Sequence, residues 1–212
     1  MSERGRIIEF MLAQNVLQFG DFTLKSGRQS PYFFNLGKVA SGAGLAELGA
    51  AYAETILSSG VEFDVLFGPA YKGIPIAVAT SVALAERGRD VGVAYNRKEA
   101  KDHGEGGWLV GADVTGRVLL VDDVLTSGKA IREAVDLIAA TGATIAGAVI
   151  AMDRQELTDQ GVTAVSALAE ELSANVISIA NMQDLIEYLN GESDQAGLLG
   201  RMRAYQAEFC AI

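Results

Sequence analysis

The sequence predicts an α/β fold in which a mainly parallel sheet is flanked by helices. Short runs that are apolar at every position, such as residues 118–121, alternate along the chain with runs whose apolar residues recur every three or four positions. The first pattern is typical of parallel strands covered on both faces, and the second of the helices that cover them. A chain of 212 residues has room for one such domain, which we expect to span residues 1–212.

The N-terminal region is expected to form a helix followed by a hairpin. The helix should end near Gly20. Residues 21–36 mix aromatic and β-branched side chains around a Ser-Gly-Arg turn and a proline, which indicates a short β-hairpin. A second helix is predicted over residues 45–56, and Gly60 stands where a helix ends. The apolar residues that indicate the first helix are Ile7, Phe10, Met11 and Leu17.

The rest of the chain alternates strands with helices. Helical runs are predicted at 74–88 and before Gly142, and the segment from Asn181 onward indicates one or two more helices. The stretch 96–116 breaks this alternation, because about twenty residues without a clear period are long for a connection in an α/β fold. Such connections are often functional. The expected strands cover residues 64–68, 91–95, 117–121, 143–152 and 175–179.

Composition excludes several classes of function. The net charge of −10 argues against a general nucleic-acid-binding or anionic-membrane-binding surface. The single cysteine, Cys210, cannot form an intrachain disulfide or a CxxC site, and the single histidine, His103, excludes sites that need two imidazoles. The longest nearly apolar run, residues 142–152, is too short to cross a bilayer, and the N-terminus lacks an apolar core of signal-peptide length. We therefore expect a cytoplasmic protein.

Two neighbouring aspartates, Asp122 and Asp123, stand at the carboxyl end of the strand 117–121. Residues 125–130 then offer backbone N–H groups at a helix start, which suits a phosphate, although the P-loop pattern GxxxxGK[ST] and the dinucleotide pattern GxGxxG both fail here. Because carboxylates accept hydrogen bonds from hydroxyl groups, the pair favours a ribose beside that phosphate. The alternative is an acidic strand end followed by an ordinary helix cap at Thr126 or Ser127.

These residues also carry a resemblance to a known family. The segment "VLLVDDVLTSGKA" resembles the 5-phosphoribosyl 1-diphosphate (PRPP) signature of type I phosphoribosyltransferases. Bacterial-type orotate phosphoribosyltransferases carry this signature together with four other segments, which this chain has in the same order: "FTLKSGRQSPYFFN", "FGPAYKGIPIA", "NRKEAKDHGEGG" and "DRQE". The chain therefore resembles that family from about Phe19 to its C-terminus. The resemblance implies the type I phosphoribosyltransferase fold, with a small hood built mainly from residues 1–40. It also implies transfer of phosphoribosyl from PRPP to N1 of orotate in pyrimidine synthesis.

The resemblance assigns the ribose hydroxyl groups to Asp122 and Asp123 and the 5′-phosphate to the loop behind them. One position departs from the family pattern, because Lys129 stands where a threonine is usual. The lysine removes a hydroxyl donor and adds a cation, while its backbone N–H can still serve. The implied phosphate-loop residues are Val124, Leu125, Thr126, Ser127, Gly128, Lys129 and Ala130, with Thr126 also touching orotate.

The resemblance also implies cations, in three segments, that bind the diphosphate group of PRPP as it leaves. A lid loop at about residues 97–110 would close over the site and reach the neighbouring subunit, so a homodimer is implied. Mg²⁺ would accompany PRPP with no direct protein ligand. The expected catalytic residues are Lys101, His103, Asp122 and Asp123. The implied PRPP-binding residues outside the acidic pair and its loop are Lys25, Tyr71, Lys72, Arg97, Lys98, Lys101 and His103. Taken alone, these residues indicate surface lysines and a solvated loop.

Orotate is a flat anion, which needs an aromatic sandwich and a donor fork for its carboxylate. Phe33 and Phe34 fit the first need, and Arg154 fits the second. The alternatives are core phenylalanines and an arginine paired with Asp153 or Glu156. Two other functions stay open: transfer of phosphoribosyl to uracil or a purine, and a PRPP-sensing regulator without catalysis. The absence of a basic module in the sequence argues against the regulator.

Overall fold

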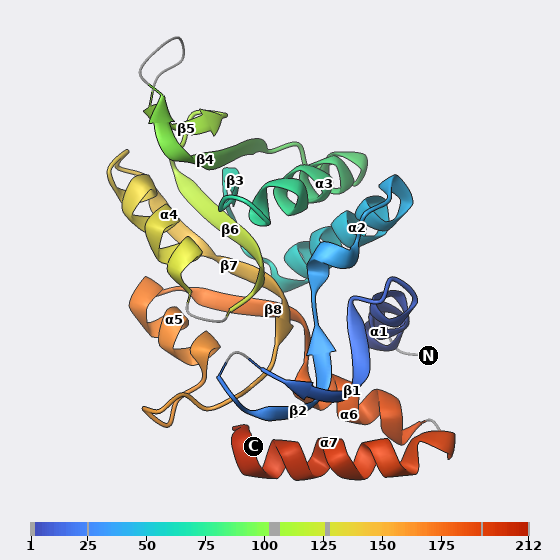
Figure 1. Ribbon diagram of the computed structural model, residues 1–212. Coiled ribbons are helices and arrows are strands. Elements are labelled where there is room, and N and C mark those ends of the chain that lie inside the picture. Colours follow the sequence, from blue (N-terminus) through green and yellow to red (C-terminus); the bar gives the residue numbers. More distant parts are fainter. Residues whose placement is uncertain (1–2, 25, 102–106, 126–127, 192, 212) are drawn as a thin grey trace.

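The computed structural model describes residues 3–24, 26–101, 107–125, 128–191 and 193–211. Its centre is a six-stranded sheet with the order β5-β4-β3-β6-β7-β8 (Figure 1). All neighbouring pairs are parallel except β4 and β5, which confirms a mainly parallel sheet. The strands are β3 (Val65–Gly68), β4 (Gly92–Lys101), β5 (Gly107–Gly111), β6 (Arg117–Val124), β7 (Thr144–Asp153) and β8 (Asn175–Asn181).

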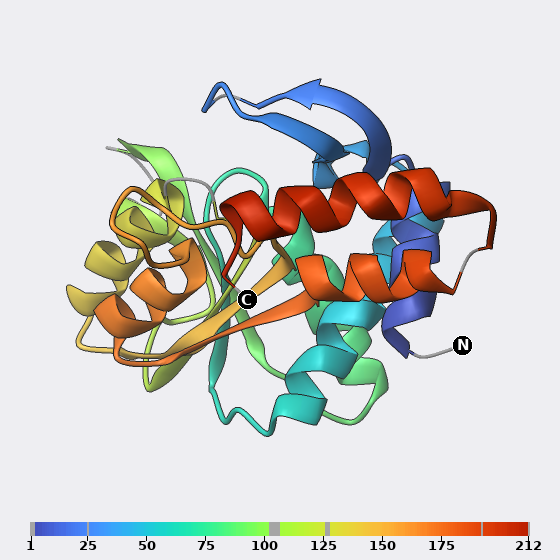
Figure 2. The ribbon, with the colours of Figure 1, turned by 90° about the horizontal axis from the view of Figure 1, so that it is seen from below.

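Helices cover both faces of this sheet (Figure 2). On one face lie α1, α2 and α3, and on the other lie α4 and α5, while α6 and α7 close the chain beside α1 and the N-terminal strands. None of the described helices is long and apolar enough to cross a membrane. Their bounds are α1 Glu3–Ala13, α2 Gly42–Ser59, α3 Gly73–Glu86, α4 Lys129–Ala139, α5 Ala164–Leu172, α6 Met182–Asn190 and α7 Ala196–Phe209, with short 3₁₀ turns η1 at Leu36–Lys38 and η2 at Ser193–Gln195.

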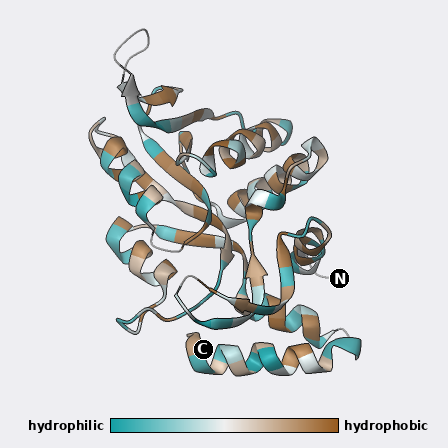
Figure 3. Cartoon of the chain, in the orientation of Figure 1, coloured by the Kyte–Doolittle hydropathy of each residue, from teal (hydrophilic) through white to brown (hydrophobic). Residues whose placement is uncertain are grey.

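The strand β6 explains why the central strands are apolar at every position. Leu119 and Val121 belong to the core cluster under α1, α2 and α3, whereas Val118 and Leu120 belong to the cluster under α4 and α5. Successive side chains of a strand point to opposite faces, so both faces need apolar residues when both are covered. Figure 3 shows the resulting hydrophobic bands along β6 and β7.

The N-terminal helix is shorter than the sequence predicts. It ends at Ala13 instead of near Gly20, and Leu17 is the first residue of β1 (Leu17–Thr23). Asn15 has a left-handed backbone (φ 56°), which ends the helix. Leu17 then pairs with Phe34 of β2 (Gln29–Phe34), so strand pairing takes precedence over the apolar spacing. The predicted hairpin is confirmed as a separate two-stranded antiparallel sheet that packs beside α7 (Figure 2).

The stretch 96–116 is more regular than its lack of period indicates. Its first residues continue β4 as far as Lys101, and β5 returns antiparallel to it, with Tyr95 opposite Val110. Arg97 supports this pairing, because its Nη1 donates to the carbonyl oxygen of Gly107 at 3.2 Å. The expectation of an aperiodic connection is therefore wrong for the described part. The two strands lie at the edge of the sheet, where charged side chains are common, so their sequence lacks the apolar pattern of a strand.

The helices α2 and α3 pack closely through Gly49. A Cβ added at Gly49 would overlap the carbonyl group of Ala79 in α3. We expect Gly49→Ala to lower the free energy of unfolding by about 1–3 kcal/mol, because rigid backbone would have to move. The matched control is Gly197→Ala in α7, where a Cβ meets nothing within 4 Å and helix propensity improves. Urea unfolding of both variants measures this, and equal stabilities would contradict the close packing.

Candidate active site

A cavity of about 800 Å³ lies at the carboxyl ends of β3, β4 and β6, and we call it the β6 pocket. The turn after β3, the middle of β4, the end of β6 and the first turns of α4 contribute its walls. This is the edge of an open parallel sheet at which ligands usually bind. Its described lining residues are Pro69, Ala70, Tyr71, Lys72, Asn96, Arg97, Lys98, Trp108, Asp122, Asp123, Val124, Leu125, Gly128, Lys129, Ala130, Glu133, Asp136 and Leu137.

Asp122 is the buried member of the acidic pair. Its backbone carbonyl accepts a 2.6 Å hydrogen bond from the hydroxyl of Tyr52, which anchors the end of β6 to α2. Its Oδ1 accepts the backbone N–H of Asp123 at 2.9 Å. Burial, and then the neighbouring charge of Asp123, raise the pKa of Asp122 to about 6. The carboxyl group is thus held in one place and is costly to ionise.

Asp123 is paired with Lys72 across the pocket. Lys72 precedes the first residue of α3, and a Cβ on Gly73 would lie 2.8 Å from the carbonyl oxygen of Val121, so only glycine lets this helix start come so close to β6. Tyr71, beside it, is 71% exposed. The turn 69–72 therefore brings a cation to the acidic pair.

Asn96 holds this turn in place, and sequence reasoning missed it. Its Oδ1 accepts the backbone N–H of Ala70 at 2.9 Å, and its Nδ2 donates to the carbonyl oxygen of Arg97 at 3.1 Å. Asn96 is buried, so both hydrogen bonds are needed to satisfy its amide. The available signal was one polar residue directly after the apolar run 91–95.

Glu133, also missed, lies between two lysines of the pocket. Its carboxylate is 3.0 Å from Nζ of Lys98 in β4 and 3.6 Å from Nζ of Lys129 at the start of α4. The hydrogen bond from Lys98 lowers the pKa of Glu133. Lys129 and Glu133 are four residues apart on one helix, a spacing that predicts such a pair. The unusual lysine of the phosphate loop is thus an ion-pair partner of Glu133.

The start of α4 has the features of an anion site. Gly128 has a left-handed backbone (φ 65°), and the helix begins directly after it. The first N–H groups of a helix have no partner within the helix, and the helix dipole favours negative charge there. Residues Thr126 and Ser127 lie outside the described part of the chain.

The candidates for orotate lie away from the lining of the β6 pocket. Phe33 is 37% exposed on β2 and its ring centroid is 5.5 Å from that of Phe22, while Phe34 packs against the larger core cluster. Arg154 follows β7 directly. Because Val124 pairs with Met152, β6 and β7 end at the same edge of the sheet.

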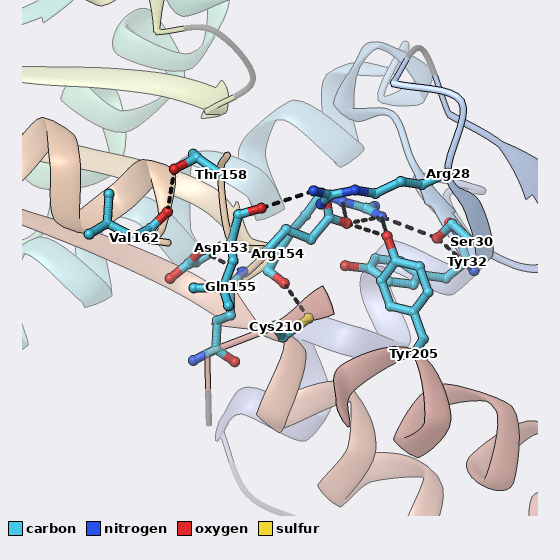
Figure 4. A network of polar contacts seen from close by, with 12 residues as sticks. Arg28, Ser30, Tyr32, Asp153, Arg154, Gln155, Thr158, Val162, Tyr205 and Cys210 are labelled. Atoms are coloured by element: carbon cyan, nitrogen blue, oxygen red, sulfur yellow. Dashed lines mark hydrogen bonds and ion pairs between the residues drawn. The ribbon is translucent and has the colours of Figure 1, made fainter. Parts of the chain in front are cut away.

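Arg154 has several partners (Figure 4). Its Nε and Nη2 contact Oε1 of Glu156 at 2.7 and 2.6 Å, so the pairing weighed as an alternative is present. The guanidinium lies 4.1 Å from the ring centroid of Tyr32, within the range of a cation–π interaction. The side chain is only 14% exposed, so its orientation is fixed by these contacts.

The structure therefore gathers one group of expected residues and separates another. The described PRPP candidates all line the β6 pocket, whereas Phe33, Phe34 and Arg154 do not. Lys25 and His103 lie outside the described residues, as does the side chain of Lys101. The described residues hold no cluster of three or more His, Cys, Asp or Glu side chains that could bind a metal.

Comparison with known proteins gives consistent results. Residues 39–180 match the model of the phosphoribosyl transferase domain. The orotate phosphoribosyltransferases of Shigella dysenteriae serotype 1 and Salmonella agona are each 55% identical over 205 residues, which is 96% of this chain and of each relative. The crystal structure of the Francisella tularensis orotate phosphoribosyltransferase has a TM-score of 0.89 and 40% identity, over 97% of this chain and 100% of that one.

A more distant relative is known in complex with a ligand. The orotate phosphoribosyltransferase of Mycobacterium tuberculosis H37Rv in complex with PRPP has a TM-score of 0.64 and 25% identity. The similarity covers 87% of this chain and 99% of that chain.

The pKa of Asp122 predicts a pH dependence of stability. Its pKa is about 6 in the folded protein and near 3.8 in the unfolded chain, so the folded state binds the proton first as the pH falls. The free energy of unfolding should therefore decrease as pH rises from 4 to 7, by on the order of 2 kcal/mol from this group. Asp122→Asn should remove that contribution. Urea unfolding of the wild type and the variant at each pH measures the free energy of unfolding. If the two proteins show the same dependence of that free energy on pH, the assignment to Asp122 is contradicted.

Proposed function

The chain belongs to the orotate phosphoribosyltransferase family, and we propose that the β6 pocket is where it joins orotate to the phosphoribosyl group of PRPP. The enzyme forms orotidine 5′-monophosphate and diphosphate in pyrimidine biosynthesis. The observation that supports this site is one acidic pair, Asp122 and Asp123, directly beside the helix start at Gly128. The carboxylates suit the ribose hydroxyl groups, and the helix start suits the 5′-phosphate.

The charges of the pocket suit exchange with an anionic substrate. Among its described lining residues, the cations Lys72, Arg97, Lys98 and Lys129 are matched by the carboxylates of Asp122, Asp123, Glu133 and Asp136. PRPP carries phosphate oxygens that compete with Asp123 for Lys72 and with Glu133 for Lys98. Each lysine then moves from a protein carboxylate to the substrate.

This exchange explains how the chain assists bond cleavage. As the bond from C1 of the ribose to diphosphate breaks, negative charge grows on the departing oxygens and positive charge on the sugar ring. Lys72 and Lys98 stabilise the former, while Asp123, released from Lys72, accepts a ribose hydroxyl. N1 of orotate then bonds to C1, and the proton that N1 loses is taken up by the departing diphosphate.

Mg²⁺ fits this pocket as the companion of PRPP. Mg²⁺ usually retains several waters and binds through one or two carboxylates together with substrate phosphates. Asp122 and Asp123 are the oxygen donors that would face it, either through water or through the ribose hydroxyl groups. When bound, the ion neutralises charge on the diphosphate.

The lid, the hood and the dimer are also proposals. We place the lid at about residues 97–110, where the β4–β5 pair projects from the edge of the sheet (Figure 1). Its outer cations, Lys101 and His103, would act in the site of the neighbouring subunit of a homodimer, while Lys98 acts in the pocket of its own chain. The hood of residues 1–40 would cover the site with the β1–β2 hairpin. Cytoplasmic location stays a prediction.

The function is tested by following ultraviolet absorbance with purified protein, PRPP and Mg²⁺. Orotate should be consumed and orotidine 5′-monophosphate formed, whereas uracil, adenine and hypoxanthine should react at least about a hundredfold more slowly, since each lacks the carboxylate. A preference for uracil or a purine would show that the enzyme transfers phosphoribosyl to that base and not to orotate. Lack of turnover with all four bases, together with PRPP-dependent DNA binding, would favour the regulator.

Sharing of the lid is tested by mixing two inactive variants. Asp123→Asn and Lys101→Ala should each lower kcat/KM by at least about tenfold, because each removes a charged contact to PRPP. After dissociation and reassociation of an equal mixture, activity should recover to about a quarter of the wild-type rate, because half of the dimers contain one intact site. A lid that acts within its own subunit predicts no recovery, which would contradict the shared site.

A further inference from the structure

We propose that Tyr205 of α7 is a positioning residue for the orotate carboxylate, acting through Glu156 and Arg154. This inference rests on the proposed function and on the role expected from the sequence, in which Arg154 binds that carboxylate. Arg154 and Glu156 lie two positions apart after β7, whereas Tyr205 comes from a segment 49 positions away from Glu156. Figure 4 shows Tyr205 and Arg154 meeting beside Ser30 and Tyr32 of β2.

One carboxylate oxygen organises this cluster. Oε1 of Glu156 accepts the hydroxyl of Tyr205 at 2.6 Å and contacts Nε and Nη2 of Arg154 at 2.7 and 2.6 Å. Tyr205 is 4% exposed, and burial and then its hydrogen bond to Glu156 raise its pKa to about 12. The phenol therefore remains a donor at neutral pH, and it fixes the oxygen that orients Arg154.

Three further contacts limit the movement of the guanidinium. Its Nη2 donates to Oγ of Ser30 at 3.1 Å and to the hydroxyl of Tyr205 at 3.4 Å, and its Cζ lies over the ring of Tyr32. The ring of Tyr205 meets that of Tyr32 edge to face, with centroids 6.2 Å apart. Thus Tyr205 touches both the aromatic support and the anionic partner of Arg154.

The arrangement leaves one donor and one charge for a ligand. Among the described residues, Nη1 of Arg154 makes no hydrogen bond, because all of the contacts above use Nε or Nη2. Oε2 of Glu156 lies 3.5 Å from Nη1 of Arg28, so a single carboxylate faces two arginines. Among Arg28, Arg154 and Glu156, positive charge exceeds negative charge by one, which suits a ligand with one carboxylate, such as orotate.

Tyr205 therefore affects the binding of orotate, the substrate with the carboxylate, and not the binding of PRPP. Without its hydroxyl, Oε1 of Glu156 loses a donor and the orientation of Arg154 is less well fixed. PRPP is bound by the β6 pocket, whose described lining includes neither Arg154 nor Tyr205. The effect on the two substrates should therefore differ.

The test compares Tyr205→Phe with the wild type in the orotate assay. The KM for orotate should rise about tenfold, as expected for one hydrogen bond in a charged network, while kcat and the KM for PRPP change less than about twofold. Tyr188→Phe on α6 is the matched control for loss of a tyrosine hydroxyl, and its KM values should stay at wild-type levels. Thermal unfolding of both variants shows whether the fold is retained.

A double-mutant cycle identifies the route of the effect. If Tyr205 acts through Arg154, then Tyr205→Phe should not change orotate affinity further in an Arg154→Ala background, as measured by calorimetry. An unchanged KM for orotate, an equal rise for both substrates, or additive losses in the double mutant would each overturn the proposal. Failure of the wild-type protein to use orotate would instead overturn the proposed function.

Discussion

The ion pair between Lys72 and Asp123 is the interaction on which the β6 pocket depends. Adjacent carboxylates repel each other, and Asp122 is buried enough that its pKa is raised to about 6 by burial and then by the charge of Asp123. Lys72 is the first of the cations that oppose this shift. Bringing it there requires the close approach of α3 to β6 at Gly73 and the hold of Asn96 on the preceding turn. Burying Asp122 at this edge of the sheet thus has an energetic cost, which the nearby Lys72 reduces.

The same sheet sets the separation between the two halves of the site. The strands β6 and β7 are neighbours with fixed register, so the acidic pair and Arg154 leave the sheet at one edge but beyond different strands. The first meets α4 and the β4–β5 pair, and the second meets the hairpin and α7. The phosphoribosyl and base sites that we propose are therefore built on separate segments.

Much of this could be predicted from sequence because it depends on local patterns. Doubly covered strands are apolar at each position, and Asp122, Asp123 and Gly128 follow one of them within a few residues. The parts that were missed depend on contacts between distant residues. The pairing of Leu17 with Phe34 decides where α1 ends, and that of Tyr95 with Val110 makes an edge strand from a charged loop. Asn96 and Tyr205 are ordinary polar residues until their partners 26 and 49 positions away are known.

Both halves of the site follow one electrostatic rule. Four described cations there pair with protein carboxylates: Lys72 with Asp123, Lys98 and Lys129 with Glu133, and Arg154 with Glu156. Such pairing lowers the affinity for an anionic substrate, because the substrate must displace or share a partner. It also keeps long side chains oriented before binding, so less conformational entropy is lost when the substrate arrives. Under the functions that we propose, Asn96, which holds the turn before Lys72, and Tyr205, which holds Glu156, contribute to substrate recognition by fixing the residues around them.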